Sequence, residues 1–138
     1  MVSPTGNHGH VGGYETIKGY KERFLLPGNG PFGHENGFFS FDYEDAHFIV
    51  LDSNYMDNTD TQAQKYLGAW IKHDLAVNQQ PAVFALMHHP MYSTSDAFND
   101  TEHAKAMRDG YLNLLYRYGV DLILCGHEHL FCRTAVEV

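Results

Sequence analysis

The sequence predicts an α/β fold, and three observations carry that prediction. Three mostly apolar runs, 46–52, 82–87 and 120–125, have the length of buried strands. Two segments with helical periodicity separate these runs. An order of strand, helix, strand, helix, strand is typical of βαβ units, in which the strands lie parallel in one sheet. The length of 138 residues fits one domain.

The first of these runs also belongs to a predicted hairpin. Residues 38–43 alternate in polarity, and only Glu44 and Asp45 separate them from the run 46–52. A turn this short joins antiparallel neighbours, so the sheet is expected to combine parallel units with one antiparallel pair. Upstream, residues 14–26 are expected to form a short helix or an irregular segment.

The first predicted helix begins at Asp60 or Thr61, both of which are good N-cap residues. It ends near Val77, because Pro81 bars its continuation into the next run. Apolar residues recur at helical spacing within it, at Ala63, Tyr66, Leu67, Trp70, Ile71 and Leu75.

The second predicted helix covers residues 102–118 and follows a loop at 90–100. Gly119 supplies its C-terminal stop. One face of this helix is expected to carry Met107, Tyr111, Leu114, Leu115 and Tyr118.

Composition narrows the classes of partner. The formal net charge of −8 argues against nucleic-acid binding, which needs a basic face. Phosphate substrates remain compatible with this charge, because bound divalent metals reverse the local field. No apolar run is long enough to span a membrane. We expect a small-molecule partner and neither nucleic acid nor membrane; oligomeric state is left open.

Histidines follow two of the strands at the ends where parallel sheets bind ligands. After the third run comes Gly126, then His127, Glu128 and His129. If this stretch is extended, His127 and His129 face the same side and can both bind a metal. The alternative is a pair of surface histidines on a loop.

The second histidine motif is His88-His89-Pro90, directly after the run 82–87. Pro90 stiffens the chain and can hold the His88 ring in place. We expect His89 to point to the other face, so that it serves the outer shell or the substrate. The alternative is two polar residues that simply end a strand.

A third motif, Gly6-Asn7-His8, lies in a short glycine loop. An Asn side chain offers a neutral oxygen to a metal and so preserves its Lewis acidity. His8, pointing elsewhere, could reach the substrate as a proton donor or oxyanion stabiliser. An ordinary Gly-Asn turn is the alternative.

Together the three motifs, in this order, resemble the calcineurin-like metallophosphoesterase superfamily, and more closely the purple acid phosphatases. The resemblance extends over nearly the whole chain. It also rests on residues 38–43 (FFSFDY), 47–52 (HFIVLD), 87–92 (MHHPMY) and 126–134 (GHEHLFCRT). It implies part of the family's αββα sandwich and a hydrolase that acts on phosphate esters through a water activated by two metals.

The resemblance also implies a ligand set. Asn7, His88 and His127 would bind one metal, His129 would bind the other, and His8 would be the catalytic group beside the substrate. His89 is the candidate substrate-binding residue. The cofactors implied for the intact enzyme are two metal ions, iron with zinc, manganese or a second iron. A secreted or extracytoplasmic location is implied as well, although no signal peptide follows Met1.

The sequence departs from the family pattern in its carboxylates. The family's opening Asp motif and its Gly-Asp motif, whose carboxylate bridges the metals, do not occur before Gly6. We therefore expect residues 1–138 to be the C-terminal portion of one catalytic domain, with the N-terminal portion missing and little activity alone. The alternatives are a non-catalytic module that binds one metal, and an enzyme whose missing motifs lie on a second chain.

Two other patterns carry no function. Gly28, Gly30 and Gly33 match the spacing of a dinucleotide fingerprint, but no helix follows and Pro31 would spoil a phosphate cradle. A serine nucleophile at Ser93 lacks the strand–turn–helix elbow that such a residue needs.

Overall fold

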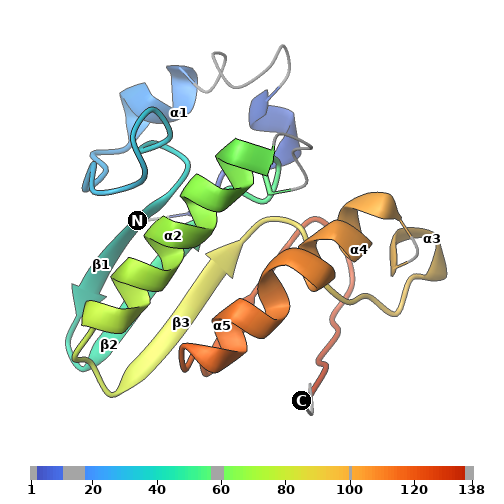
Figure 1. Ribbon diagram of the computed structural model, residues 1–138. Helices are drawn as coiled ribbons and strands as arrows, with labels where there is room; N and C mark the ends of the chain where they lie inside the picture. Colours follow the sequence, from blue (N-terminus) through green and yellow to red (C-terminus); the bar gives the residue numbers. More distant parts are fainter. Residues whose placement is uncertain (1–2, 11–17, 57–60, 100, 136–138) are drawn as a thin grey trace.

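The computed structural model describes residues 3–10, 18–56, 61–99 and 101–135. Four strands form one mixed sheet in the order β1-β2-β3-β4. Figure 1 labels the first three of them. Their bounds are Phe39–Tyr43 for β1, Ala46–Leu51 for β2, Ala82–Met87 for β3 and Leu122–Leu124 for β4. The pair β1–β2 is antiparallel, whereas β2–β3 and β3–β4 are parallel. This confirms the predicted α/β class, with parallel units and an antiparallel hairpin.

The hairpin turns at the predicted position. Tyr43 pairs with Ala46, and Glu44 adopts a left-handed conformation with φ of 52°. Residues in tight hairpin turns adopt positive φ because the backbone twist of such turns matches the twist of the flanking strands.

The first long helix, α2, spans Thr61–Val77, close to its predicted bounds. Asp60 lies outside the described residues, so its predicted capping role stays a prediction. Near the N-terminus, the turn η1 covers Asn7–His10 and the short helix α1 covers Lys18–Arg23, within the segment 14–26.

The prediction of one continuous second helix is wrong in one respect, because a π-helical turn lies within it. Its three parts are α4 (Glu102–Met107), η3 (Arg108–Leu112) and α5 (Asn113–Arg117). Gly110, the poorest helix former of this stretch, lies in the π turn. The loop expected at 90–100 also contains a short helix, α3 (Asp96–Asn99).

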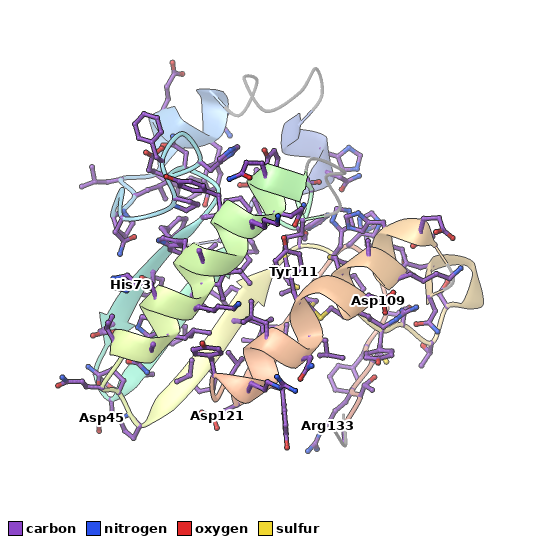
Figure 2. The ribbon with its side chains drawn as sticks, viewed as in Figure 1. Asp45, His73, Asp109, Tyr111, Asp121 and Arg133 are labelled. Carbon is purple, nitrogen blue, oxygen red and sulfur yellow. The ribbon has the colours of Figure 1, made fainter. Side chains whose placement is uncertain are left out.

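Both helical connections pack on one face of the sheet (Figure 1). Two parallel crossovers that step in the same direction across a sheet put their helices on the same side, because such crossovers are right-handed. Tyr111, labelled in Figure 2, belongs to the core between these helices and the sheet. Fully buried members of that core include Ile49, Leu51, Ile71, Ala85, Met107 and Leu115. Tyr118, expected on the same face, is exposed.

The other face of the sheet carries apolar side chains with less cover. Phe41, Phe48 and Phe84 pack side by side across three strands and are half-buried. In the same row, Leu122 and Leu124 of β4 are 48% and 49% exposed. None of the helices in the described part of the chain is both long and apolar enough to cross a bilayer.

The ends of the sheet differ in character. Asp45 and Asp121, labelled in Figure 2, mark the end where β2 and β4 begin. There the Asp121 carboxylate accepts a hydrogen bond from the Val83 amide at 2.8 Å. The histidine motifs lie at the opposite end, beyond the carboxyl termini of β3 and β4.

Candidate metal centre

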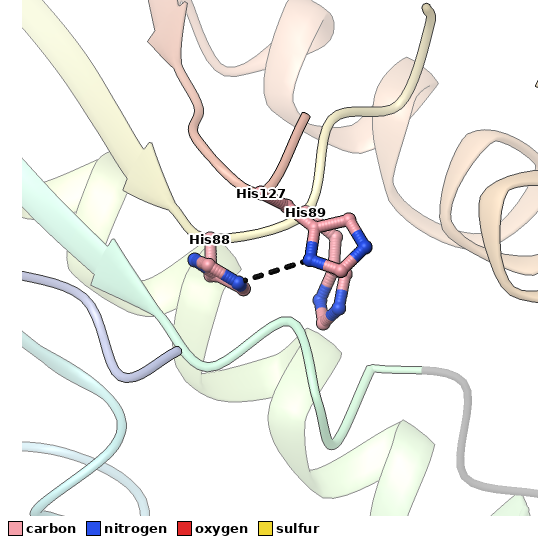
Figure 3. Close-up of side chains that lie close together, drawn as sticks. All are labelled: His88, His89 and His127. Atoms are coloured by element: carbon pink, nitrogen blue, oxygen red, sulfur yellow. Dashed lines mark hydrogen bonds between the residues drawn. The ribbon is translucent and has the colours of Figure 1, made fainter. Parts of the chain in front are cut away.

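Two of the sequence motifs and part of the third meet at the carboxyl end of the parallel strands. The Nε2 atom of His88, directly after β3, lies 2.8 Å from Oδ1 of Asn7 and 3.2 Å from Nδ1 of His127. Figure 3 shows the rings of His88, His89 and His127 gathered at this point, with the His88–His127 contact dashed. The structure thus brings together three of the four predicted metal ligands.

The Asn7 loop passes close over the His88 ring at Gly6. A Cβ added to Gly6 would lie 3.2 Å from Cε1 and 3.3 Å from Nδ1 of the His88 ring. Such contacts are tighter than ordinary van der Waals packing and would push the ring or the loop away. The absence of a side chain at Gly6 therefore allows this close approach of the loop to the ring.

A tight turn, not an extended segment, presents His127. Its φ is 66°, and the Glu128 amide donates to the Gly126 carbonyl oxygen at 2.8 Å. The Gly126 amide in turn donates to the His88 carbonyl oxygen at 2.9 Å, which ties the two motifs together. A left-handed histidine is a strained conformation of the kind that gathers at functional sites.

This turn corrects the expectation that His127 and His129 face the same way. That expectation assumed extended backbone, in which residues two apart share a face. The left-handed His127 breaks the alternation, and His129 is exposed and lies outside the three-histidine group. Its role as a ligand of the second metal stays a prediction.

The expected orientation of His89 is also wrong. Its ring centroid lies 4.8 Å from that of His88 and 4.4 Å from that of His127. One ring nitrogen from each of the three histidines falls within 4.8 Å of the others. Strand β3 ends at Met87, so the alternation of sides in a strand no longer applies to residues 88 and 89.

Residues that the sequence did not single out hold His89. Ser53 Oγ lies 2.9 Å from His89 Nδ1 and accepts a hydrogen bond from the His89 amide at 2.9 Å. The Phe98 ring lies parallel to the imidazole at 6.2 Å, and the His103 ring meets it edge-on at 4.5 Å. Ser53 follows β2 at the same sheet edge, a signal that could have identified it. No periodicity places Phe98 or His103.

Burial favours the neutral form of His88. Loss of solvent contact lowers the pKa of its imidazole, and the charges of His127 and His8 lower it further, against an opposing effect of Asp52. A neutral imidazole is the form that binds metals. Asp52, directly after β2, is fully buried, and its Oδ1 accepts a hydrogen bond from the side-chain amide of Asn54 at 2.8 Å.

His8, the predicted catalytic residue, lies in the turn η1 and is exposed. It is close enough to influence His88 electrostatically. An exposed histidine beside a cation site can meet a substrate, and its catalytic role stays a prediction.

The donors at this site fit a transition-metal ion. Imidazole nitrogens and one amide oxygen suit zinc, iron and similar cations, whereas calcium and magnesium prefer oxygen ligands alone. For a second ion, His129 is the predicted donor. No carboxylate belongs to the histidine group found among the described residues.

The sequence is also similar to proteins of a known family. The family model described as calcineurin-like phosphoesterase matches residues 4–131. The chain belongs to the calcineurin-like phosphoesterase family. Family membership implies divalent metal ions.

The chain is similar to purple acid phosphatases among curated proteins. Purple acid phosphatase 23 of Arabidopsis thaliana is 35% identical over 122 residues, which cover 86% of this chain and 25% of that protein. Purple acid phosphatase 22 of the same plant is 33% identical over 123 residues, covering 87% and 27%. The chain thus spans about a quarter of the length of these relatives.

A solved structure supports the fold. Purple acid phosphatase PPD1 from yellow lupin seeds superposes with a TM-score of 0.59 at 20% sequence identity. The superposition covers 92% of this chain and 23% of that one. The four-stranded mixed sheet and its helices therefore match part of the purple acid phosphatase fold.

Proposed function

We propose that this chain provides metal ligands for a phosphoesterase of the acid phosphatase type, which hydrolyses phosphate esters. The observation that carries the proposal is the meeting of Asn7, His88 and His127 within hydrogen-bond distance, from three separate segments of the chain. Family membership supports the same reaction class.

In this proposal, Asn7, His88 and His127 bind one metal, and His129 binds the other. Iron paired with zinc, manganese or a second iron would, when bound, activate a water molecule for attack on phosphorus. The Asn7 oxygen adds no negative charge, so it orients the ion without weakening its Lewis acidity. His8 faces the substrate as a proton donor or oxyanion stabiliser, and His89 lies beside the substrate.

We also propose that residues 1–138 form one portion of a catalytic domain, with carboxylate ligands supplied from residues outside this sequence. Two dications a few ångströms apart repel strongly, and a bridging carboxylate offsets that repulsion. The half-covered row of Phe41, Phe48 and Phe84 supports this division, because a further layer of the domain could pack there. The chain alone is then weakly active or inactive.

A chimera tests the function without depending on the chain's own activity. Residues 4–131 replace the matching segment of purple acid phosphatase 23, and release of p-nitrophenol from p-nitrophenyl phosphate is measured alongside metal content. The chimera is expected to turn over. His88→Ala and His127→Ala in it should each lower turnover more than about 100-fold, since even outer-shell changes cost 10–100-fold.

His73→Ala is the matched control, because that histidine lies exposed on α2, away from the site. The control should keep the chimera's turnover. A folded chimera that binds two metals per chain but releases no p-nitrophenol would count against the proposal. So would a His88→Ala variant with unchanged turnover.

The second candidate is a non-catalytic module that binds one metal. The three-histidine group favours it, because its donors suffice for one ion. One metal per chain, with no hydrolysis in the chimera, would favour this candidate. An extracytoplasmic location is proposed from the family resemblance, and fractionation of cells that express the native gene tests it.

A further inference from the structure

We propose that His89 is a direct metal ligand, so that three imidazoles, from His88, His89 and His127, hold a single cation. The inference rests on the proposed metal-binding function of this site, but it does not require hydrolysis. It assigns His89 a place on the metal that neither the sequence motif nor the proposed substrate contact gives it.

The spacing of the ring nitrogens supports this assignment. In a tetrahedral zinc site with bonds of about 2.0–2.1 Å, neighbouring nitrogens are roughly 3.3–3.4 Å apart. His88 Nε2 and His127 Nδ1 are already 3.2 Å apart. One ring nitrogen from each of the three histidines lies within 4.8 Å of the others, so the three rings are close enough to share one ion.

In this proposal Ser53 orients the His89 ring, and Nε2 is the nitrogen that binds the metal. Its Oγ lies 2.9 Å from His89 Nδ1 and also accepts from the His89 amide. When Nδ1 donates its proton to this oxygen, the imidazole lone pair is on Nε2, and the metal binds there. A hydrogen bond from the non-coordinating nitrogen is the usual way in which a metal-bound histidine is oriented.

Aromatic rings also flank His89 on one face and at one edge. The residue is 8% exposed, with the parallel Phe98 ring on one side and the His103 ring edge-on at 4.5 Å. A confined ring loses little conformational freedom when it binds a metal. Asn7 Oδ1, 2.8 Å from His88 Nε2, adds one oxygen donor to these three nitrogens.

The experiment follows the ring nitrogens directly. The 138-residue chain, labelled with ¹⁵N, is titrated with Zn²⁺, and histidine ring nitrogens are followed by long-range ¹H–¹⁵N correlation. At one equivalent, the expected result is a coordination shift at His88 Nε2, His127 Nδ1 and His89 Nε2. Zinc affinity is measured in parallel by calorimetry.

Two substitutions separate coordination from packing. His89→Asn keeps an amide near the position of Nδ1, where it can still meet Ser53, but removes Nε2. It should weaken zinc binding at least about tenfold, as loss of a metal-site partner does. His89→Ala should weaken it at least as much, and His73→Asn, on the exposed face of α2, should leave it unchanged.

Three results would overturn the inference. They are a titration in which His88 and His127 shift but His89 does not, an unchanged zinc affinity in His89→Asn, and the absence of stoichiometric zinc binding. Failure of the phosphoesterase proposal is read separately, because it depends on p-nitrophenol release by the chimera and not on these nitrogen shifts.

Discussion

The Nε2 atom of His88 lies 2.8 Å from the amide oxygen of Asn7, although 81 positions separate the two residues in the sequence. The contact joins the end of β3 to the turn η1 and places a nitrogen and an oxygen donor side by side. Both donors can turn toward one cation, which makes Asn7 the residue whose loss should report most directly on the site.

Replacing Asn7 with Leu removes the oxygen but keeps the number and branching of the side-chain heavy atoms. Zinc affinity of the chain, measured by calorimetry, should fall at least about tenfold, because one donor is lost. Asn113→Leu, at an exposed position that begins α5, serves as the control and should bind zinc as the parent does. Equal affinities for the Asn7 and Asn113 variants would exclude Asn7 as a ligand.

Arg108 fixes the loop that carries Phe98 to the site. Its guanidinium donates to the Met91 carbonyl at 2.8 Å and to the Asn99 carbonyl at 3.0 Å, and it lies 5.1 Å from the Tyr92 ring centre. Arg108→Gln should lower the free energy of unfolding by about 1.5–3 kcal/mol, the range for hydrogen bonds to charged groups.

Urea unfolding measures this loss, and Arg117→Gln, on the exposed side of α5, should change stability by less than about 0.5 kcal/mol. If Arg108→Gln were as stable as the parent, the loop would have to be held by other contacts.

His47 makes stability depend on pH. Its hydrogen bond to Asp74 at 2.9 Å raises its pKa, burial opposes this, and the hydrogen bond to Asp42 at 2.7 Å raises the pKa further. Because the pKa of His47 is higher in the folded state, its protonated form stabilises the fold. This stabilisation is fully present below the pKa of the unfolded state, about 6.5, and is lost as pH rises through the pKa of the folded state.

The difference in unfolding free energy between the parent and His47→Gln should therefore be largest near about pH 6 and shrink toward alkaline pH. At acid pH the stabilisation from His47 falls again. The His47 hydrogen bond lowers the pKa of Asp42, and protonation of the Asp42 carboxylate ends that interaction. His73→Gln should show no such trend. A parent-minus-variant difference that does not change with pH would contradict the role given to His47.

Two glycines should respond to alanine in opposite directions. A Cβ at Gly30 would lie 1.8 Å from the Phe38 carbonyl oxygen, which is backbone and cannot move aside, whereas a Cβ at Gly68 meets nothing within 4 Å. Gly68→Ala, inside α2, should stabilise the protein by about 0.5–1 kcal/mol. Gly30→Ala should destabilise it by several kcal/mol, well beyond the usual effect of about 1 kcal/mol. Thermal and urea unfolding of both variants measure whether each substitution raises or lowers the free energy of unfolding.

The half-covered face of the sheet should bind hydrophobic dyes. Leu122 and Leu124 are about half exposed, next to the row of Phe41, Phe48 and Phe84. Exposed apolar patches of this kind promote dye binding and self-association. The paired change Leu122→Gln with Leu124→Gln should reduce both, measured by dye fluorescence and gel filtration. A parent chain that is monomeric and binds no dye would show that this face is covered.

Much of the fold follows from local sequence signals. The apolar runs at 46–51 and 82–87, the turn at Glu44 and the stop before Pro81 each act within a few residues. Because the strands alternate with helices along the chain, neighbouring strands pair in parallel. Parallel pairing places residues 88 and 127 at the same edge of the sheet. The histidine site was therefore predictable in location from the sequence.

What the sequence determined was the set of elements, their order and the edge at which His88 and His127 gather. What only the tertiary structure decided was the direction of each ring at that edge. Strand periodicity ends with the strand, so the inward position of His89 and the left-handed turn at His127 depend on contacts made across the fold. The contacts of Ser53 and Phe98 with His89 come from residues far away in sequence, which no local pattern can specify.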